Sequence, residues 1–564
     1  RVSLCHIWLT CSCSALILSC EMLLAGGVGM GATFIQPPRV ATGAVRLRIV
    51  ASDTTLAGPV PWLNRKMTGK NPRAARFSAP MKLLCSLVLL LLASFATAAT
   101  PPNIIYILVD DLGYGDLGCY GQKMLKTPNL DRMAAEGMKF TRHYAGSTVC
   151  APSRCVLMTG LHTGHCRVRG NDPWTIPDSD VTVPNFLKTA GYHTACIGKY
   201  GLGKPLPMND PEKKGFDEFY GYVGTSHAHN FYTKAIIING RVSPLPNTVI
   251  EGSFKNAADY VDADFTGTGV APLDGRKQWV PQLCSNEVRH HLTERSRDKG
   301  KPFFLYYAMN IPHANNEAGK DSPLGHGMEC PDYGEFANRD WPDAEKGFAQ
   351  LIRFLDDEVG RIMAELKRLG IYENTLVMFS SDNGPHHEGG HDSDFFNSNG
   401  DFKGTKRDMT DGGIRVPFIA WWPGTIKAGT VSEHVSGFQD LLPTVAELSG
   451  VKLHAETDGI SLVPTLLGRE GQKQHSHLFW DFNEQGGKRA VLKWPWKLIH
   501  LNTGAAPADA KAKAKGKAAK PKPLEKLLYN LETDIGEETN LAAEKPEIVA
   551  ELEKLMKESY RAPQ

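Results

Sequence analysis

Continuous apolar runs mark three strands in the middle of the chain. They cover residues 103–109 (Asn-Ile-Ile-Tyr-Ile-Leu-Val), 302–308 (Pro-Phe-Phe-Leu-Tyr-Tyr-Ala) and 375–381 (Thr-Leu-Val-Met-Phe-Ser-Ser). A strand is an unbroken apolar run when both of its faces are buried, as in a parallel sheet covered by helices. We therefore predict that the three runs belong to one central sheet.

Segments with helical periodicity lie between these strands. Residues 127–137 predict a helix with Pro128 in its first turn and Gly137 at its end. Residues 343–369 predict a longer helix that ends at Gly370, and its apolar positions recur at helical spacing. Those positions include Leu351, Phe354, Leu355, Val359 and Ile362. The alternation of strand and helix predicts an α/β fold with a mostly parallel central sheet flanked by helices.

The sequence changes character after about residue 475. Residues 489–501 predict a strand pair around Trp494-Pro495, residues 527–531 predict a further strand, and residues 545–560 predict a terminal helix. We therefore expect a catalytic domain at 100–475 and a small C-terminal α+β subdomain at 476–564.

Residues 505–523 interrupt this subdomain with a low-complexity mixture of Ala, Lys and Pro. Such a composition cannot bury a core. We interpret the segment as a solvated loop, with binding of a polyanion as the less favoured alternative.

We expect a targeting signal in the N-terminal part of the chain. Residues 81–99 combine a short basic start, an apolar core and a small-residue Ala-x-Ala end, which are the parts of a secretory signal peptide. The apolar core is too short for a comfortable membrane span. We expect Met81 to be the natural start, with residues 1–80 as upstream sequence; a genuine N-terminal extension with an internal anchor is the alternative. We therefore expect the protein to be periplasmic or secreted, with no stable membrane span after the signal peptide is removed.

Composition excludes two classes of partner. The chain has 63 basic and 61 acidic residues, a net charge of +2, so it carries no electrostatic footprint for nucleic acid or an anionic membrane. Hydrophobic content of 42% and charged content of 22% are those of a globular protein. Seven cysteines follow Ala99, and because the number is odd, export would still leave at least one thiol unpaired.

Two acidic pairs directly follow predicted strands. Asp110-Asp111 follows the first strand, and Asp382-Asn383 follows the third. Ligands bind at the carboxyl ends of the strands in open α/β sheets. Three carboxylates and one amide oxygen are hard ligands that suit Ca²⁺ or Mg²⁺ rather than zinc.

A reactive-residue candidate lies in Cys150-Ala151-Pro152-Ser153-Arg154. By itself, Cys150 is equally compatible with a small, inert buried thiol. Arg154 follows four residues later, so on a helix it would lie one turn from Cys150 and point the same way. A cation there would hold an anion or polarise whatever Cys150 becomes.

The segment from Cys150 to Gly160 closely resembles the signature of the sulfatase family, Cys-x-Pro-Ser-Arg followed by a Thr-Gly turn. The resemblance extends from Asn103 to about Tyr560 and is to the arylsulfatase A branch. Further motifs occur in the order of the family, at residues 103–116, 127–131, 198–199, 380–384, 412–417, 529–531 and 540–542. The resemblance implies an alkaline phosphatase-like catalytic domain that hydrolyses sulfate esters and releases inorganic sulfate.

The resemblance also implies a mechanism and its cofactors. A formylglycine-generating maturation enzyme oxidises Cys150 to formylglycine (3-oxoalanine), whose hydrate, a gem-diol, attacks the sulfur of the ester. The alcohol leaves, and the second hydroxyl then expels sulfate, so this is covalent catalysis without attack of water on sulfur. A bound Ca²⁺, with Mg²⁺ less favoured, polarises the sulfate oxygens.

Individual roles follow from the same resemblance. Asp110, Asp111, Asp382 and Asn383 match the calcium ligands, with the modified Cys150 also facing the metal. Arg154 matches the arginine that steadies the formylglycine hydrate.

Three further residues match catalytic, sulfate-binding positions. Lys199 and Lys406 match the family's lysines, with Lys403 as the competitor of Lys406. His313 matches a histidine that binds sulfate and protonates the leaving oxygen, a task that suits the ordinary pKa of histidine. Ser226 is a weaker match to a substrate-binding serine.

Gly201 departs from the family pattern. The family motif Gly-Lys-Trp-His-Leu-Gly is Gly-Lys-Tyr-Gly-Leu-Gly at residues 198–203, so Gly201 stands where a histidine takes the proton as sulfate is expelled. His227 and His229 are the candidate replacements and candidate substrate-binding residues, with loop-lining residues as the equal alternative. A milder change is Asp411, which replaces a glutamate.

A histidine-rich segment follows Asp382-Asn383. His386, His387 and His391 invite a zinc interpretation, but oxygen ligands and glycines surround them, so we favour substrate contact or a polar loop. The partner predicted for an exported enzyme with such a rim is a sulfated carbohydrate or another sulfate ester. The alternatives are a phosphatase or phosphonate hydrolase, which the full signature disfavours, and a silent sulfated-glycan-binding protein, which only Gly201 favours.

Overall fold

The computed structural model describes residues 101–562, apart from 172–174, 203–209, 251–268, 321 and 505–521, together with four short strands near the N-terminus. The predicted signal peptide, most of residues 1–80 and most of the predicted loop 505–523 lie outside the described residues. The four short strands form two antiparallel pairs within the unit Arg1–Ala96, which is described by itself. They are β1 (Trp8–Thr10) with β4 (Ala44–Arg46), and β2 (Glu21–Leu24) with β3 (Val28–Gly31).

A ten-stranded sheet forms the centre of the second unit, Thr97–Gln564. The five strands β9, β8, β12, β5 and β13 run parallel in its middle, and antiparallel pairings occur toward both edges. The order is β11 (Arg241–Pro244), β10 (Ala235–Ile238), β9 (Glu218–Tyr222), β8 (His193–Lys199), β12 (Phe303–Pro312), β5 (Asn103–Asp110), β13 (Thr375–Ser381), β14 (Phe418–Trp421), β6 (Met138–Phe140) and β15 (Thr430–Ser432). The predicted mostly parallel sheet is confirmed.

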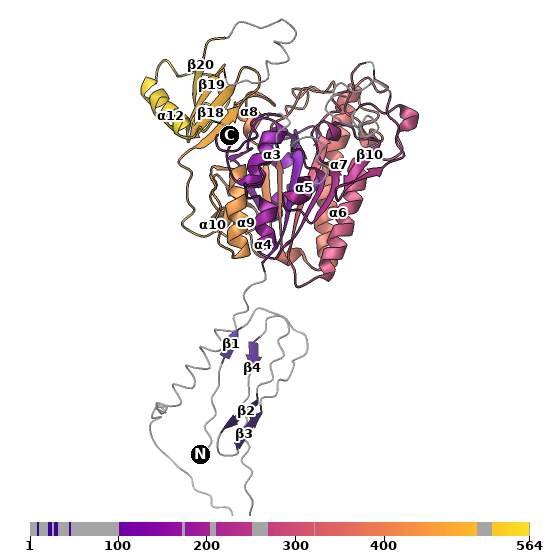
Figure 1. Cartoon of the computed structure of the whole chain (residues 1–564), viewed down its shortest axis with the longest axis vertical. Helices are drawn as coiled ribbons and strands as arrows, with labels where there is room; N and C mark the ends of the chain where they lie inside the picture. Colours follow the sequence, from indigo (N-terminus) through magenta and orange to yellow (C-terminus); the bar gives the residue numbers. More distant parts are fainter. Residues whose placement is uncertain are drawn as a thin grey trace, which may run out of the picture. The chain divides into compact units, whose positions relative to one another are not determined.

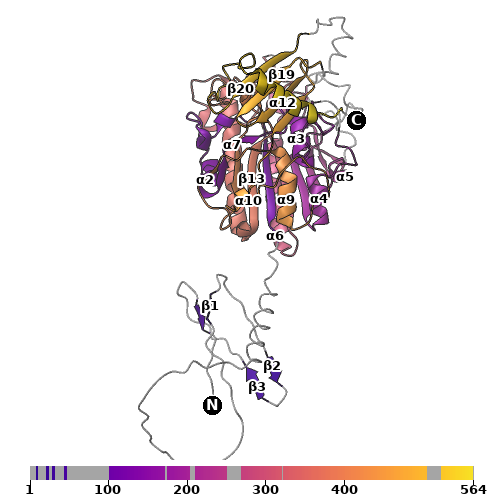
Figure 2. The same ribbon diagram turned by 90° about the vertical axis from the view of Figure 1, so that its left-hand side faces the viewer.

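Helices cover both faces of this sheet (Figures 1 and 2). One face carries α2 (Pro128–Glu136), α6 (Val280–Arg297) and α7 (Asp343–Leu369); the other carries α3 (Cys150–Thr159), α4 (Val183–Thr189) and α9 (Leu441–Ser449). Side chains alternate along a strand, and β5 accordingly divides its side chains between two cores. Ile105, Ile107 and Val109 join the first core, whereas Ile104, Tyr106 and Leu108 join the second. This double burial explains why β5 is an unbroken apolar run.

A four-stranded antiparallel sheet forms the C-terminal part. It consists of β17 (Leu478–Phe482), β18 (Lys488–Lys493), β19 (Trp496–Leu501) and β20 (Glu525–Asn530). The predicted strand pair around Trp494-Pro495 is therefore confirmed. One face packs against α12 (Pro546–Glu558), and the other packs against Tyr144, Val149, Met409 and Ile414 of the large domain.

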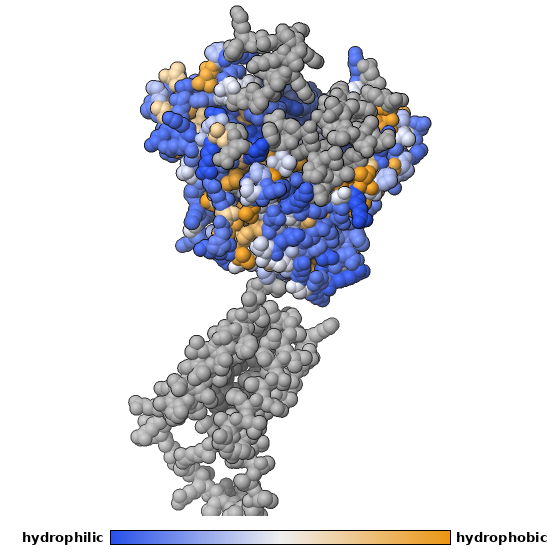
Figure 3. Space-filling model, in the orientation of Figure 1, coloured by the Kyte–Doolittle hydropathy of each residue, from blue (hydrophilic) through white to orange (hydrophobic). Residues whose placement is uncertain are grey.

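Short elements complete the described fold. They are β7 (His143–Tyr144), β16 (Ser436–Gly437), α5 (Asp210–Lys213), α8 (Asp411–Ile414), α10 (Val463–Leu466), η1 (Tyr114–Asp116), η2 (Gly118–Tyr120), η3 (His227–His229), η6 (Leu273–Gly275), η7 (Gly334–Phe336), η8 (Tyr372–Asn374) and η9 (Phe438–Asp440). Within the described part of the chain, no helix combines the length and the apolar character that crossing a bilayer requires. The described surface in Figure 3 is mostly hydrophilic. All seven cysteines after Ala99 are free thiols in this structure.

Asp356 of α7 stabilises the start of α2. Its buried carboxylate accepts hydrogen bonds from the backbone N–H groups of Asn129 (3.0 Å) and Leu130 (2.8 Å) and from the Asn129 side chain (2.9 Å). Thr127, at the N-cap of α2, makes no side-chain cap of its own. Because the first-turn N–H groups of a helix need acceptors, a side chain from another helix performs this task here.

Asp356→Ala should therefore lower the free energy of unfolding by about 2–3 kcal/mol, because it leaves buried donors unsatisfied. Urea denaturation followed by circular dichroism measures the change. Asp357→Ala removes the neighbouring, partly exposed carboxylate and serves as the control. Equal stability of the two variants would contradict this role for Asp356.

Candidate active site

The carboxyl ends of β5 and β13 bring the two acidic pairs together. The strands are parallel neighbours with Ser381 opposite Val109, so Asp110-Asp111 and Asp382-Asn383 leave the sheet side by side. The backbone N–H of Asp111 donates to Asp382 Oδ1 (3.1 Å), and Asn383 Nδ2 donates to Asp111 Oδ1 (2.7 Å). These four buried residues, here named the acidic cluster, lie together as the sequence predicts.

Arg154 connects the cysteine motif to this cluster. Helix α3 begins at Cys150, so Arg154 lies one turn later, and both side chains are buried. Its Nε and Nη2 donate to Asp382 Oδ2 (2.9 and 2.7 Å), and Nη2 also lies 3.3 Å from Asp110 Oδ1. Nη1 donates to the carbonyl oxygen of Lys199 (2.6 Å). The guanidinium therefore fixes the start of α3 against the ends of β5, β13 and β8.

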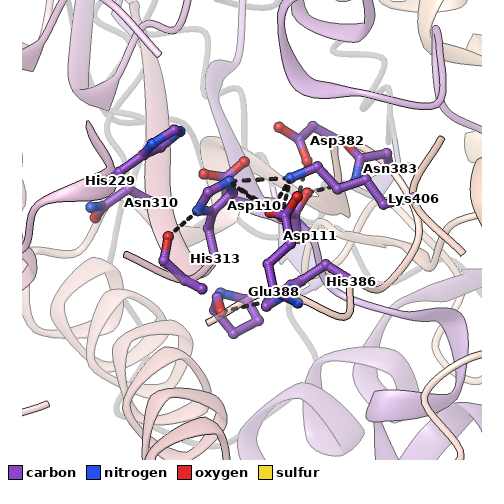
Figure 4. A network of polar contacts seen from close by, with 12 residues as sticks. Asp110, Asp111, His229, Asn310, His313, Asp382, Asn383, His386, Glu388 and Lys406 are labelled. Atoms are coloured by element: carbon purple, nitrogen blue, oxygen red, sulfur yellow. Dashed lines mark hydrogen bonds and ion pairs between the residues drawn. The ribbon is translucent and has the colours of Figure 1, made fainter. Parts of the chain in front are cut away.

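Two buried lysines neutralise the remaining carboxylate oxygens. Lys199 Nζ, at the end of β8, lies 2.6 Å from Asp110 Oδ2, and Lys406 Nζ lies 2.8 Å from Asp111 Oδ2. Lys406 also contacts Glu388 Oε2 (2.9 Å), as Figure 4 shows. Lys403, the alternative to Lys406, contacts Glu537 and Glu538 at the surface instead. The structure thus selects Lys406.

His313 follows β12 and completes this group. Its Nδ1 lies 2.6 Å from the carbonyl oxygen of Ala314, which assigns the proton to Nδ1. Its Nε2 then accepts from Lys406 Nζ (3.2 Å) and lies 3.4 Å from Asp111 Oδ2. Burial, followed by the charge of Lys406, lowers the pKa of His313 well below its usual value, so the imidazole is neutral in this arrangement.

The acidic cluster fits a divalent cation. Asn383 Oδ1 is buried without a hydrogen-bond partner among the described residues, and ligand atoms of Asp110, Cys150 and Asp382 lie within 4.8 Å of one another. Burial and then the charge of Asp110 raise the pKa of Asp382 to about 7. The pKa values of Asp110 and Asp111 are instead held below their usual values, despite burial, mainly by Lys199 and Lys406, so Asp382 is the carboxylate that a further cation would stabilise most. The hard oxygens of the cluster suit Ca²⁺.

The environment of Cys150 does not by itself produce a reactive thiolate. Burial raises the pKa of its thiol to about 11, and the nearby lysines only partly oppose this effect. The thiolate is the nucleophilic form of cysteine. An unmodified Cys150 would thus be a poor nucleophile, in keeping with its predicted role as a precursor.

Gly201 lies where a side chain would enter the site. Its φ is +70°, and a Cβ atom there would lie 3.0 Å from Arg154 Cδ and 3.4 Å from Lys199 Cε. The backbone of this chain therefore presents the position of the missing histidine directly to the two cations. A histidine here would also need a left-handed backbone, which glycine adopts without strain.

The three loop residues proposed as substrate contacts separate in the structure. His227 is fully buried, its Nε2 lies 2.9 Å from the carbonyl oxygen of Ala235, and its ring packs edge-on against Tyr222. Its role as a substrate contact stays a prediction. His229 instead stacks on His313, and in Figure 4 His313 lies between His229 and Lys406. Among the described residues, no contact of the acidic cluster involves Ser226, whose role stays a prediction.

The three histidines after Asn383 also occupy different environments. His386 is buried and shares a group of close ligand atoms with Asp111 and Glu388. His391 stacks on Phe348 and contacts Glu345 (2.7 Å), whereas His387 is partly exposed beside Asp392. This separation disfavours a zinc site that combines the three.

Glu388 is the site residue that the sequence analysis missed. Its carboxylate contacts Lys406 and Arg407 (2.7 Å) and lies 3.7 Å from His313 Nε2. Burial would raise the pKa of Glu388, but nearby positive charges, above all that of Lys406, hold it below its usual value. The carboxyl group is therefore ionised. Its position five residues after Asn383 could have identified Glu388 as a neighbour of the acidic cluster. From the sequence, only the histidines of this segment are considered as candidates.

Known proteins with this arrangement identify the family. The family model described as Sulfatase matches residues 102–451, and the model described as N-sulphoglucosamine sulphohydrolase, C-terminal, matches residues 401–503. The chain belongs to the sulfatase family. It is therefore a sulfuric ester hydrolase, and its predicted alkaline phosphatase-like fold is confirmed by the solved sulfatase structures that it resembles.

Individual relatives agree with this assignment. This sulfatase is 35% identical to the N-acetylgalactosamine-6-sulfatase of Mus musculus over 432 residues, which are 72% of this chain and 73% of that protein. It is 33% identical to the arylsulfatase A of Homo sapiens over 498 residues, 83% and 89% of the two proteins. The crystal structure of Ps i-CgsB superposes with a TM-score of 0.64 at 27% identity and covers 82% of this chain and 94% of its own.

The C-terminal sheet contacts the loops of the sulfatase site through a buried network of ion pairs. Lys497 of β19 contacts Asp411 Oδ1 (2.7 Å) and Glu537 Oε1 (2.9 Å), and all three side chains are inaccessible. Asp411 begins α8, and the next residues bind the loops of the site: Gly412 N–H donates to the Lys403 carbonyl (2.8 Å), and Gly384 N–H donates to the Gly413 carbonyl (3.0 Å). Asp411, the milder departure from the family, is thus well paired.

Lys497→Met should lower the free energy of unfolding by about 3 kcal/mol or more, because it leaves the buried Glu537 without a cation and Asp411 with Arg415 alone. Burial already raises the pKa of Glu537 to about 7. Without Lys497 both carboxyl pKa values rise, so the deficit relative to wild type should be larger at pH 8 than at pH 5. Denaturation curves at both pH values measure this, with exposed Lys493→Met as the control. A deficit independent of pH would contradict the ionic role.

Proposed function

We propose that this sulfatase hydrolyses sulfate esters of a sulfated carbohydrate, with formylglycine made from Cys150 as its nucleophilic residue and Ca²⁺ as its metal. The observation that carries this proposal is the position of Cys150 at the first residue of α3, beside Asp110 and Asp382 and within reach of the charges of Lys199 and Lys406. A maturation enzyme is the partner that the modification requires. Export to the periplasm or the medium is part of the same proposal.

The residues divide the chemistry between them. Asp110, Asp111, Asp382 and Asn383 would hold the metal, which when bound polarises sulfate oxygens and favours ionisation of the attacking hydroxyl. Arg154 holds Asp382 and Asp110 in place. Lys199 and Lys406 place positive charge where negative charge develops on the sulfate oxygens. The Nε2 atom of His313 accepts a hydrogen bond from Lys406 Nζ (3.2 Å); once protonated at Nε2, His313 would donate that proton to the leaving oxygen.

Support for the carbohydrate comes from relatives. N-acetylgalactosamine-6-sulfatase is named for an amino-sugar sulfate, and Ps i-CgsB has been crystallised in complex with k-i-k-neocarrahexaose. The acidic Glu388 and basic Arg407 at the site offer hydrogen bonds to sugar hydroxyls. A neutral, apolar alcohol would find few matching groups there.

The test combines modification and turnover. Protein from a maturation-competent host should carry an aldehyde at residue 150 by mass spectrometry and should release sulfate from defined sulfated saccharides. Cys150→Ala should release none, because no other side chain can carry the hydrated aldehyde. Cys155→Ala, one turn further along α3, is the matched control. Active protein with only free thiol at position 150 would refute the proposed nucleophile.

Asp382→Asn should lower kcat/KM about a thousandfold or more, through weaker metal binding and loss of the Arg154 ion pair. Calorimetry with Ca²⁺ should show a single strong site in wild type and much weaker binding in the variant. Asp392→Asn, an exposed acid nearby in the chain, is the control. Normal Ca²⁺ binding by Asp382→Asn would remove this residue from the metal site.

A further inference from the structure

We infer that Glu317 and His229 form a subsite that binds a hydroxyl group on the alcohol part of the substrate. The inference rests on the proposed function in one respect: His313 serves the leaving oxygen, so the alcohol lies beside His313. The subsite would contact the alcohol that leaves, whereas the acidic cluster and the lysines would contact the sulfate through the metal and directly, respectively.

His229 is held against His313 by ring stacking. The two imidazoles are nearly parallel, with ring centroids 4.7 Å apart and an interplanar angle of 15°. His313 is itself fixed through Nδ1 to the Ala314 carbonyl and through Nε2 to Lys406. His229 therefore lies one ring away from the residue proposed to protonate the leaving oxygen (Figure 4).

Glu317 presents a buried acceptor at the same place. Its side chain is only 4% exposed, and its Oε2 lies 3.6 Å from His229 Nδ1. Neither atom has a hydrogen-bond partner among the described residues, although both are buried. A buried carboxylate oxygen without a hydrogen bond is costly, so this pair of atoms points to a ligand group that contacts both of them from one side.

The backbone around Glu317 is fixed before any ligand arrives. Asn315 Oδ1 accepts the Glu317 N–H (3.1 Å), and Asn315 Nδ2 donates to the Gly269 carbonyl (2.9 Å) and to Glu329 Oε2 (3.0 Å). Glu317 is therefore carried by a preorganised turn, and binding needs little ordering of the protein.

The chemistry of the pair selects a hydroxyl group. An ionised carboxylate only accepts hydrogen bonds, whereas a neutral imidazole can donate through Nδ1. A hydroxyl can donate to Glu317 and accept from His229 at once. Sugar sulfates carry free hydroxyl groups close to the ester, whereas simple aryl sulfates carry none. The subsite would thus favour saccharide esters over aryl esters.

Glu317→Gln is the decisive variant, tested on three substrates. They are a monosulfated saccharide that the wild type hydrolyses, its analogue with hydrogen in place of the hydroxyl beside the ester, and 4-methylumbelliferyl sulfate. A hydrogen bond to a charged group contributes enough for the saccharide kcat/KM to fall about 10–100-fold, mainly through KM. The ratio of saccharide to aryl kcat/KM should fall at least about tenfold.

His229→Phe keeps the stacked ring but removes the nitrogen, so it should change the same ratio in the same direction. Glu335→Gln, which neutralises an exposed glutamate, is the control for net charge. Denaturation midpoints confirm that the variants fold. An unchanged ratio in Glu317→Gln, or equal losses on the saccharide and its deoxy analogue, would overturn the subsite. A wild type that hydrolyses none of the esters would overturn the proposed function instead.

Discussion

The structure depends on a cluster of buried charges at the carboxyl ends of the parallel strands. Three carboxylates of the acidic cluster lie within contact of Arg154, Lys199 and Lys406, all of them shielded from water. Burying such charges opposes folding unless each is paired. Even with these partners, Asp110 and burial raise the pKa of Asp382. The buried charges of the site thus oppose folding. A further cation beside Asp382, and an anion beside the lysines, would offset part of this cost.

The fold holds these charges at fixed separations. Neighbouring parallel strands β5 and β13 place the two acidic pairs together, and the neighbouring strands β8 and β12 place Lys199 and His313 at the same edge. The first residue of α3 is Cys150, so the helix presents the cysteine and, one turn later, Arg154 to the same carboxylates. The C-terminal sheet packs on Val149 and holds Asp411 through Lys497, which connects it to the loop of Lys406.

The substrate side of the site has a different character. The charged groups of the acidic cluster and its lysines are buried and paired, whereas Glu317 Oε2 and His229 Nδ1, 3.6 Å apart, have no hydrogen-bond partner among the described residues. Paired groups suit a fixed chemical centre, because reorganisation there would slow the reaction. Unpaired groups suit recognition, because a ligand that satisfies them is favoured over one that cannot. In the proposed function, chemistry and selectivity therefore occupy adjacent but distinct parts of one site.

Local sequence determined the strands, the long helix and the short motif from Cys150 to Arg154. Residues 103–109 and 375–381 are apolar because both faces of each strand are buried, and Cys150 with Arg154 is a motif within one helical turn. Tertiary structure alone placed Lys406 rather than Lys403 beside the acidic cluster, buried His227 against Tyr222, and brought Glu388 into contact with Lys406. The reason is physical: periodicity reports which face of an element is buried, but not which distant side chain it meets. That meeting depends on long-range packing, which no short window of sequence contains.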